Sequence, residues 1–351
     1  SIGEMNSIIP IINKLNEKHL NLDFLVTSVT FSSGKIAEEK FKHLKNVNHR
    51  YFPVDVRFLI SKFLNKWKPN VIFLVDSEIW PNLINLAKKN KIPLALINAR
   101  LTKKSFNRWM MFETSAREIF SHFKLCLASN EETKNFLNKL NVKNVLSVGN
   151  IKLINDTNIE NIKTINEKVL TKRKFWCASS THEGEELFCL NVHTELKKKY
   201  RDIITIIAPR HIERNNKIKM LCEDLNLNSQ ILNRNDKISE DKEVIIINSF
   251  GSLLEYFKFA RSVFVGKSLL KRLQNDSGQS PIDAAKLGCK IYHGPFVYNF
   301  EEIYKILNDN NISTQIKSCE ELKNNLVVDF NNSKKDTQKY SHLLNNLGQK
   351  P

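Results

Sequence analysis

The sequence predicts an α/β protein with two doubly wound domains, each built on a parallel β-sheet. Short apolar runs alternate with amphipathic runs almost throughout the 351 residues. The apolar runs have the length of strands, and the amphipathic runs repeat their apolar residues at helical spacing. This regular alternation favours parallel sheets that helices cover on both faces. The chain is also long enough for two domains of ordinary size.

The first half of the chain opens on a predicted helix over residues 4–18, which no strand precedes in this sequence. A further helix is predicted over 56–68, where Phe63 and Trp67 recur at helical spacing. The strands predicted for this half are Phe24–Thr30, Val71–Asp76, Pro93–Ala99, Leu125–Ser129 and Val145–Gly149.

The second half repeats the pattern, with a helix predicted over 183–200. Its predicted strands are Lys174–Ser179, Ile203–Ala208, Gln230–Leu232, Val244–Asn248, Ser262–Gly266 and Cys289–His293. A polar stretch without strong periodicity separates the two series. We therefore expect a first domain over 1–150, an inter-domain linker over 151–172, a second domain over 173–328 and a helical tail over 329–351.

The composition is that of a globular protein, with 41% hydrophobic residues and a formal net charge of +17. Such a charge indicates an anionic partner, or it merely reflects a Lys- and Asn-rich composition; both interpretations stay open. The six cysteines form no C-x-x-C pair, and several lie in strand-like runs, which predicts buried free thiols. No window approaches the roughly 20 apolar residues of a membrane span.

Several function classes lose support because their motifs are absent. The sequence has no P-loop, no G-x-G-x-x-G fingerprint and no G-x-S-x-G nucleophile elbow. Basic residues do not interleave with aromatic residues as in a nucleic-acid-binding module, so we expect no nucleic-acid partner. No carboxylate pair or histidine spacing predicts a metal site.

The segment 178–186, with sequence ASSTHEGEE, lies where a strand meets a helix. Ser180 and Glu183 fit a capping box, in which the serine caps the helix and the glutamate reaches back. His182 has no second histidine one helical turn on, which excludes a zinc motif. The third interpretation is that this junction faces a ligand.

Other strand ends carry polar residues in the same way. Pro81 suits the first turn of a helix that follows Asp76. Arg210 follows an apolar run and is able to hold a phosphate through its planar guanidinium, or it is simply a solvated loop residue. Residues 248–252 start another helix, and helix starts offer free amides to anions.

The segment 277–285 combines a glycine with helix-start residues. Ser280 is a predicted N-cap, Pro281 suits the first helical position and Asp283 the third. Capping does not explain Gly278, which would allow a ligand to approach the backbone closely.

Six motifs stand in order along the chain: SIGE at 1–4, SEIWPN at 77–82, NARL at 98–101, STHEGEE at 180–186, PRHIER at 209–214 and SGQSPIDAA at 277–285. Taken together, these motifs resemble those of the 3-deoxy-D-manno-octulosonic acid (Kdo) transferases of lipopolysaccharide assembly. The resemblance extends from Ser1 to at least the segment 294–303.

The resemblance implies a GT-B glycosyltransferase, with two Rossmann-like domains facing a central cleft. It implies that the first domain binds the acceptor and the second the donor, CMP-Kdo. It also implies an N-terminal membrane-anchor helix and a first strand that this chain lacks, and no metal or other cofactor.

The same resemblance assigns roles to individual residues. Glu4 matches the catalytic base. The residues implied for the donor are Lys152, Ser180, Thr181, His182, Arg210, Ser249, Gly251, Gly278, Ser280 and Asp283. The residues implied for the acceptor are Asp76, Glu78, Asn82 and Arg100. For Trp80, packing in the core is the stronger expectation.

This chain departs from the family pattern in the predicted donor site. Where the family has V-G-G-S, the sequence is Val265-Gly266-Lys267-Ser268, and a longer loop follows. The family's G-H-N-P-x-E becomes Gly278-Gln279-Ser280-Pro281-Ile282-Asp283, and Ser252 replaces a common acidic residue. These changes leave the identity of the donor open.

We therefore expect an inverting transferase that moves Kdo from CMP-Kdo to a hydroxyl of a lipid A precursor, lipid IVA, at the cytoplasmic face of the inner membrane. An anionic membrane surface is a further expected partner. The helix over 57–68 and the segment 103–124 mix cations with aromatic residues and fit either an interfacial face or ordinary amphipathic packing. The alternatives are a transferase of another activated sugar, and a basic binding protein without catalysis.

Overall fold

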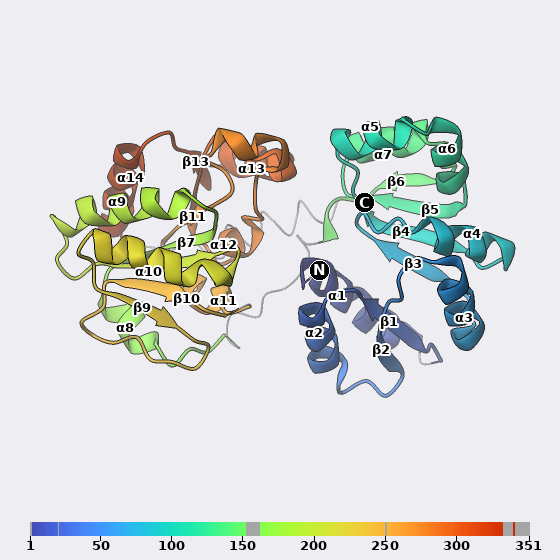
Figure 1. Ribbon diagram of the computed structural model, residues 1–351, viewed down its shortest axis with the longest axis horizontal. Coiled ribbons are helices and arrows are strands. Elements are labelled where there is room, and N and C mark those ends of the chain that lie inside the picture. The colour runs from blue at the N-terminus through green and yellow to red at the C-terminus, as the bar shows by residue number, and fades with distance from the viewer. Residues whose placement is uncertain (1, 20, 152–161, 250, 333–339, 341–351) are drawn as a thin grey trace. The chain divides into compact units, whose positions relative to one another are not determined.

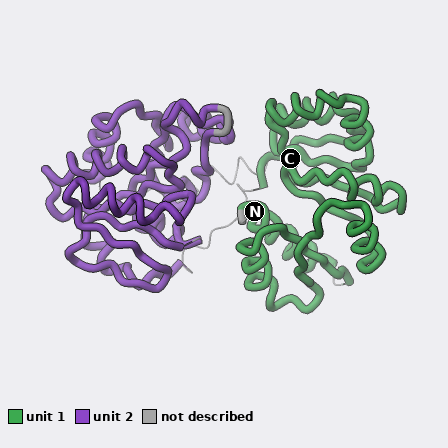
Figure 2. Tube along the Cα trace, in the orientation of Figure 1, with its two compact units in different colours: residues 1–155, 345–351 green, residues 156–344 purple. Residues whose placement is uncertain are grey.

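The computed structural model describes residues 2–19, 21–151, 162–249, 251–332 and 340 (Figure 1). The chain divides into two compact units, which Figure 2 distinguishes by colour. Unit 1 takes the first 155 residues, and unit 2 begins at residue 156. Each unit is an α/β structure with parallel sheets.

Unit 1 carries two separate parallel sheets, one of two strands and one of four. The smaller sheet pairs β1 (Phe24–Ser28) with β2 (Val47–Tyr51). The larger has the order β3 (Ile72–Val75), β4 (Leu94–Ala99), β5 (Phe123–Ala128) and β6 (Val145–Ser147). The helices are α1 (Ile2–Lys18), α2 (Phe31–Phe41), α3 (Arg57–Trp67), α4 (Pro81–Lys89), α5 (Lys103–Met110), α6 (Glu113–Ser121) and α7 (Glu131–Lys139).

Local chemistry explains where the helix after β3 begins. Pro81 takes the first position of α4, as predicted, where its missing N–H costs no hydrogen bond. The Asp55 carboxylate caps this helix, because it accepts from the backbone N–H groups of Asn82 and Leu83, both at 2.9 Å. Trp80 packs against the core of the larger sheet, which confirms the packing expected for it.

Unit 2 is built on one seven-stranded sheet in which every pair is parallel. The strand order is β13 (Ser313–Gln315), β12 (Lys290–His293), β11 (Ser262–Val265), β7 (Phe175–Thr181), β8 (Ile204–Pro209), β10 (Val244–Ile247) and β9 (Ser229–Leu232). The α-helices are α8 (Glu167–Lys172), α9 (Glu185–Lys197), α10 (Asn215–Asp224), α11 (Leu253–Phe257), α12 (Ile282–Lys286), α13 (Glu301–Asp309) and α14 (Cys319–Asn331).

Helices cover both faces of this sheet, because alternate residues of its central strands are all buried. Val244 and Ile246 of β10 join one core cluster with side chains of α9, α10 and α14. Ile245 and Ile247, which point to the other face, are equally buried. A parallel sheet requires this double cover, and the strand order makes unit 2 doubly wound.

The strands predicted from the sequence are confirmed, with ends that differ by a few residues. The prediction missed β2 and β13, which are edge strands. Five of the six cysteines are buried free thiols as predicted, and Cys319 is half-buried. Among the described residues, no helix is long and apolar enough to cross a membrane.

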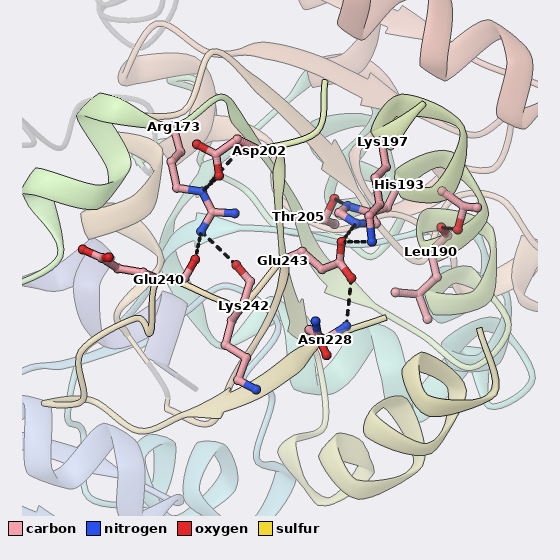
Figure 3. A network of polar contacts seen from close by, with 11 residues as sticks. Arg173, Leu190, His193, Lys197, Asp202, Thr205, Asn228, Glu240, Lys242 and Glu243 are labelled. Carbon is pink, nitrogen blue, oxygen red and sulfur yellow. Dashed lines mark hydrogen bonds and ion pairs between the residues drawn. The ribbon is translucent and has the colours of Figure 1, made fainter. Parts of the chain in front are cut away.

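A buried polar network ties α9 to the amino ends of the strands in unit 2 (Figure 3). His193 is fully buried, and its Nδ1 shares a 2.8 Å hydrogen bond with Thr205 Oγ1. Its Nε2 lies 3.5 Å from Glu243 Oε2, which also pairs with Lys197 Nζ at 2.5 Å. The backbone N–H of Asn228 donates to the other Glu243 oxygen at 2.9 Å. Glu243 thus holds the starts of β9 and β10 against α9.

We expect this network to make unit 2 sensitive to acid. Burial alone would raise the pKa of the Glu243 carboxyl, but the hydrogen bonds from His193 and Lys197 outweigh it and lower the pKa from 4.5 to about 2. A group whose pKa is lower in the folded state stabilises the fold above its unfolded pKa. That stabilisation, about 1–3 kcal/mol, is lost as the pH falls from 4.5 through 2.

Hydrogen exchange at β8 and β10 amides between pH 3 and pH 6 measures the effect against Glu243→Gln. In the parent, the protection of these amides should fall as the pH falls. In the variant, the protection should be low already at pH 6 and should change little down to pH 3. A variant that loses protection as steeply as the parent would show that another group carries the acid sensitivity.

Candidate active site

The edge of unit 2 formed by the carboxyl ends of β7 and β11 is the topological switch point of its sheet. From β7 the chain passes to β8, then to β9 at the edge of the sheet and to β10 between them, and it returns to β11 on the other side of β7. Ligands of doubly wound sheets bind at such a point. Ser180 and Thr181 end β7 here and His182 follows it, while Gly266 and Lys267 follow β11.

The two strand ends approach each other so closely that only glycine fits at position 266. A Cβ atom there would lie 2.6 Å from Thr181 Cα and 2.7 Å from the Ser180 carbonyl oxygen. The Gly266 N–H donates to the Ser179 carbonyl at 2.8 Å. The segments after β7 and β11 therefore form one continuous polar edge.

Glu185 organises this edge from within, because its carboxylate is fully buried and accepts from four backbone N–H groups. Its Oε2 accepts from His182 at 2.9 Å and from Lys267 at 2.7 Å. Its Oε1 accepts from Ser268 at 2.9 Å and from Leu269 at 3.0 Å. Charge-assisted bonds of this kind are about twice as strong as neutral ones.

The capping box predicted for Ser180 and Glu183 is wrong. Ser180 adopts a left-handed φ of 55° and β7 continues to Thr181, so the helix begins only at Glu185 after Gly184. Glu185, rather than Glu183, bonds back to the preceding loop.

His182 is a half-buried side chain on this edge. Its Nδ1 donates to the Ser180 carbonyl at 3.1 Å, and its ring lies 5.8 Å from that of His211, edge to face. Burial lowers the pKa of His182, and the charge of Lys267 adds to this, while the Ser180 carbonyl and Glu185 oppose it. The imidazole is therefore held neutral near pH 7, so it is able to bind a ligand through hydrogen bonds.

The loop after β8 carries Arg210, which is exposed. Its backbone N–H donates to the Thr181 carbonyl at 3.0 Å, so Arg210 and the fully buried Thr181 lie side by side. Arg214, one turn on, pairs with the buried Glu186 at 3.1 Å and with Glu183 at 3.5 Å. The structure thus brings the 180–186 and 209–214 motifs together and leaves the Arg210 side chain at the surface.

Two further predicted donor segments reach the carboxyl edge of the sheet. After β10, the hydroxyls of Ser249 and Ser252 share a 2.7 Å hydrogen bond beside Gly251, whose φ is 80°. After β11, the Gly278 N–H donates to the Lys267 carbonyl at 2.6 Å. This bond links the 277–283 segment to the switch point.

The helix start after Gly278 differs from the prediction. Pro281 is the N-cap residue instead of the first helical residue, and the Ser280 hydroxyl accepts only a long bond, 3.4 Å, from the N–H of Ile282. Gly278 has a φ of 88°, and a Cβ atom there would meet the Val297 backbone at 3.0–3.1 Å. The close approach predicted for a ligand is thus made by the protein's own backbone. Asp283 is exposed.

In unit 1, the polar residues Asp76, Asn98 and Arg100 gather where β3 and β4 end. Asp76 and Asn98 both have left-handed φ values, 57° and 52°, and the Asn98 amide donates to the Asp76 carboxylate. The Arg100 N–H donates to the Asp76 carbonyl at 3.1 Å. Strained backbone at the ends of two adjacent strands is typical of a functional edge.

Glu4 and Glu78 also lie near each other in unit 1. Burial raises the pKa of Glu78, and the negative charges of Glu4 and Asp76 raise it further, while a 2.9 Å hydrogen bond from Trp80 Nε1 opposes them. The structure therefore brings together Glu4, Asp76 and Glu78, three residues that the sequence pointed to separately.

Other predicted residues have structural contacts or lie outside the described part. The Asn82 amide donates to the Asp55 carbonyl at 2.6 Å, so part of its role is to hold the start of α4. Lys152 lies outside the described residues. Among the described residues, no group of three or more His, Cys, Asp or Glu side chains is arranged to hold a metal ion.

Comparison with solved structures identifies the fold. The chain is similar to UDP-N-acetylglucosamine 2-epimerase from Neisseria meningitidis, with a TM-score of 0.62 at 16% identity over 99% of this chain and 95% of that one. The two units have the GT-B fold, which many glycosyltransferases share.

Comparison of sequences identifies the family. A family model described as 3-deoxy-D-manno-octulosonic-acid transferase (kdotransferase) matches residues 1–155. The 3-deoxy-D-manno-octulosonic acid transferase of Rickettsia typhi is 30% identical over 95% of this chain and 72% of its own length. That of Rickettsia bellii is 31% identical over 95% of this chain and 79% of its own length. The chain belongs to the 3-deoxy-D-manno-octulosonic acid transferase family, and it is therefore a glycosyltransferase.

Sequence reasoning missed the part that Glu185 takes in the site. The residue stands inside the segment quoted for the resemblance, but three of its four N–H partners lie 82–84 positions away in the chain. No local pattern signals such a contact. Only the pairing of β7 with β11 brings the partners together.

Proposed function

We propose that this chain transfers Kdo from CMP-Kdo to a hydroxyl of a lipid A precursor, lipid IVA. The observation that carries the proposal is its membership of the family, with about 30% identity to curated Kdo transferases over most of the chain. The clustered polar residues at the switch point of unit 2 support a nucleotide-sugar site there.

In the proposed reaction, Glu4 takes the proton from the acceptor hydroxyl as its oxygen attacks the anomeric carbon of Kdo. The bond from that carbon to the phosphate oxygen breaks, and CMP leaves with the bonding electrons. Attack from the face opposite the phosphate inverts the anomeric centre, through an oxocarbenium-like transition state. This step needs a base on the acceptor side and positive charge near the leaving phosphate.

On the donor side, the proposal assigns Arg210 to the phosphate, because its side chain is exposed at the β7–β8 edge. Ser180, Thr181 and His182 line the same edge, Ser249, Ser280 and Asp283 supply further polar side chains, and Gly251 and Gly278 keep their proposed places beside them. Lys152 keeps its proposed place near the donor. On the acceptor side, Asp76, Glu78, Asn82 and Arg100 lie on unit 1 with Glu4.

We further propose that unit 1 meets an anionic membrane surface, at the cytoplasmic face of the inner membrane. Two exposed apolar side chains, Met111 and Phe112, join α5 to α6 and are 75% and 71% exposed. Helix α5 has no buried residue and carries Lys103, Lys104 and Arg108. Basic residues near anionic lipid contribute roughly 1 kcal/mol each, and apolar side chains add to this when they insert.

We expect the double substitution of Met111 and Phe112 by serine to weaken binding to vesicles that contain phosphatidylglycerol by about tenfold. Partial burial of two such side chains in the interface is worth roughly 1–3 kcal/mol. Co-sedimentation measures the binding, and Met220→Ser serves as the control, because Met220 is 62% exposed on unit 2. Equal binding of vesicles by the double variant and the parent would show that the junction of α5 and α6 does not contact the membrane.

The decisive experiment measures CMP release from CMP-Kdo in the presence of lipid IVA, with mass spectrometry of the lipid product. CMP release together with Kdo on the lipid supports the proposal. Transfer from a UDP-sugar instead would favour the alternative donor. Salt-sensitive binding to DNA or vesicles without any nucleotide affinity would favour a non-catalytic basic protein.

A further inference from the structure

Lys267 occupies the switch point of unit 2, where neither the family motifs nor the capping patterns assign it a role. It stands two residues after the end of β11, next to the end of β7. Ser180 lies at the end of β7, and His182 is the first residue after that strand. A side chain at this position lies where doubly wound sheets bind the phosphates of their ligands.

The backbone of Lys267 is held in a conformation that lysine rarely adopts. Its φ is 56°, in the left-handed region, which costs a residue with a Cβ atom about 1–2 kcal/mol. Two hydrogen bonds enforce it: the Lys267 N–H donates to Glu185 at 2.7 Å, and its carbonyl accepts from Gly278 at 2.6 Å. Strain that the surroundings impose in this way is characteristic of ligand-binding positions.

The amides around Lys267 are already occupied by an anion of the protein itself. Successive backbone N–H groups form an anion-binding concavity in many phosphate sites. Here the N–H groups of Lys267, Ser268 and Leu269 all donate to Glu185, as does that of His182. Those four amides are therefore not available to a phosphate at this edge, so cationic side chains have to balance its negative charge instead.

The charge of Lys267 reaches the site. Burial is the main cause of the lowered pKa of His182, and the positive charge of Lys267 is among the further causes. The backbone N–H groups of Lys267 and His182 both donate to Glu185 Oε2, at 2.7 Å and 2.9 Å, so the two residues lie side by side at this edge. Arg210, whose backbone bonds to Thr181, supplies a second cation at the adjoining edge.

We infer that Lys267 binds the phosphate of the nucleotide-sugar donor, and that Glu185 is the positioning residue that holds Lys267 in place. This inference rests on the proposed function of the same site and deepens it. The cation replaces the backbone amides that Glu185 occupies, and it stabilises the phosphate charge as the sugar departs.

The test compares Lys267→Asn with Lys91→Asn by calorimetric titration of CMP and of cytidine. Asparagine tolerates a left-handed φ, so the substitution removes the cation and leaves the backbone in place. Lys91 is the matched control, because it is exposed in unit 1 with a φ of 57°. Loss of a charge-assisted bond to phosphate should weaken CMP binding by Lys267→Asn about 10–100-fold. Cytidine binding, and both ligands in Lys91→Asn, should be unchanged.

Two results would overturn the inference while leaving the proposed function intact: equal CMP affinity in Lys267→Asn and the parent, or an equal loss of CMP and cytidine affinity. Titrations with UDP and uridine separate the two proposals. If the parent binds UDP but not CMP, and Lys267→Asn weakens UDP alone, the CMP donor is wrong and the role of Lys267 stands. If the parent binds neither nucleotide, both proposals fail.

Discussion

If Glu4 is the base, as we propose, Glu4→Gln should reduce the rate of sugar transfer by about 10²–10⁴ and leave the CMP binding proposed for unit 2 unchanged. General base catalysis contributes a factor of this size, and glutamine keeps the shape of the side chain without its basicity. Glu4 lies in the first turn of α1, half-buried, where its charge helps to raise the pKa of Glu78. It is thus in the same electrostatic neighbourhood as the strand-end carboxylates of unit 1.

Glu17→Gln is the matched control for this variant. Glu17 lies on the same helix, its side chain is 67% exposed, and it pairs only loosely with Lys14 at 3.7 Å. Initial rates of CMP release at saturating CMP-Kdo should be normal for Glu17→Gln. A Glu4→Gln chain that folds, binds CMP and transfers the sugar at a rate within a factor of about three of the parent's would show that another residue is the base. Glu78 would then be the first to test, because its raised pKa suits proton transfer.

The alternation of strands and helices could be predicted because each central strand of unit 2 is apolar on both faces. Val244–Ile247 is an unbroken run of β-branched residues, as a doubly covered strand requires. The missed strands lack that signal. β2 has the sequence VNHRY and no buried residue, and β13 has three residues, STQ, of which only Ser313 is buried. Both are edge strands, so tertiary pairing rather than local pattern defines them.

The candidate site was predictable as a set of strand ends but not as a set of contacts. The sequence pointed to His182 and Arg210 because polar residues follow apolar runs there. It did not reveal that the capping pattern at Ser180 is not formed. Nor did it reveal that Glu185 accepts hydrogen bonds from the loop after β11, more than 80 residues away. Ser180 and Lys267 also adopt left-handed φ values that neither residue type favours. Such conformations depend on tertiary hydrogen bonds, which no local propensity encodes.

Glu185→Gln should destabilise unit 2 by roughly 2–5 kcal/mol. The carboxylate is fully buried, and each of its oxygens accepts from two backbone N–H groups. Glutamine retains one oxygen and sets an NH₂ group against the other two donors. Each buried N–H left without an acceptor costs about 1–3 kcal/mol. Urea unfolding measures the loss in a background with Trp67, Trp80 and Trp109 replaced by phenylalanine, so that the fluorescence comes from Trp176, which is fully buried in unit 2.

The neighbouring variant Glu183→Gln is the control, because it removes an exposed carboxylate instead of a buried one. The Glu183 side chain is 63% exposed and pairs with Arg214 at 3.5 Å, so its loss should change stability by less than about 0.5 kcal/mol. If Glu185 positions Lys267, a second effect of Glu185→Gln is expected. At a temperature at which the variant remains folded, its affinity for CMP should fall while its affinity for cytidine does not. Destabilisation with both affinities intact would mean that Glu185 supports the fold alone. An unchanged midpoint would mean that the four amides find other acceptors, and that the loop after β11 is not held by this carboxylate.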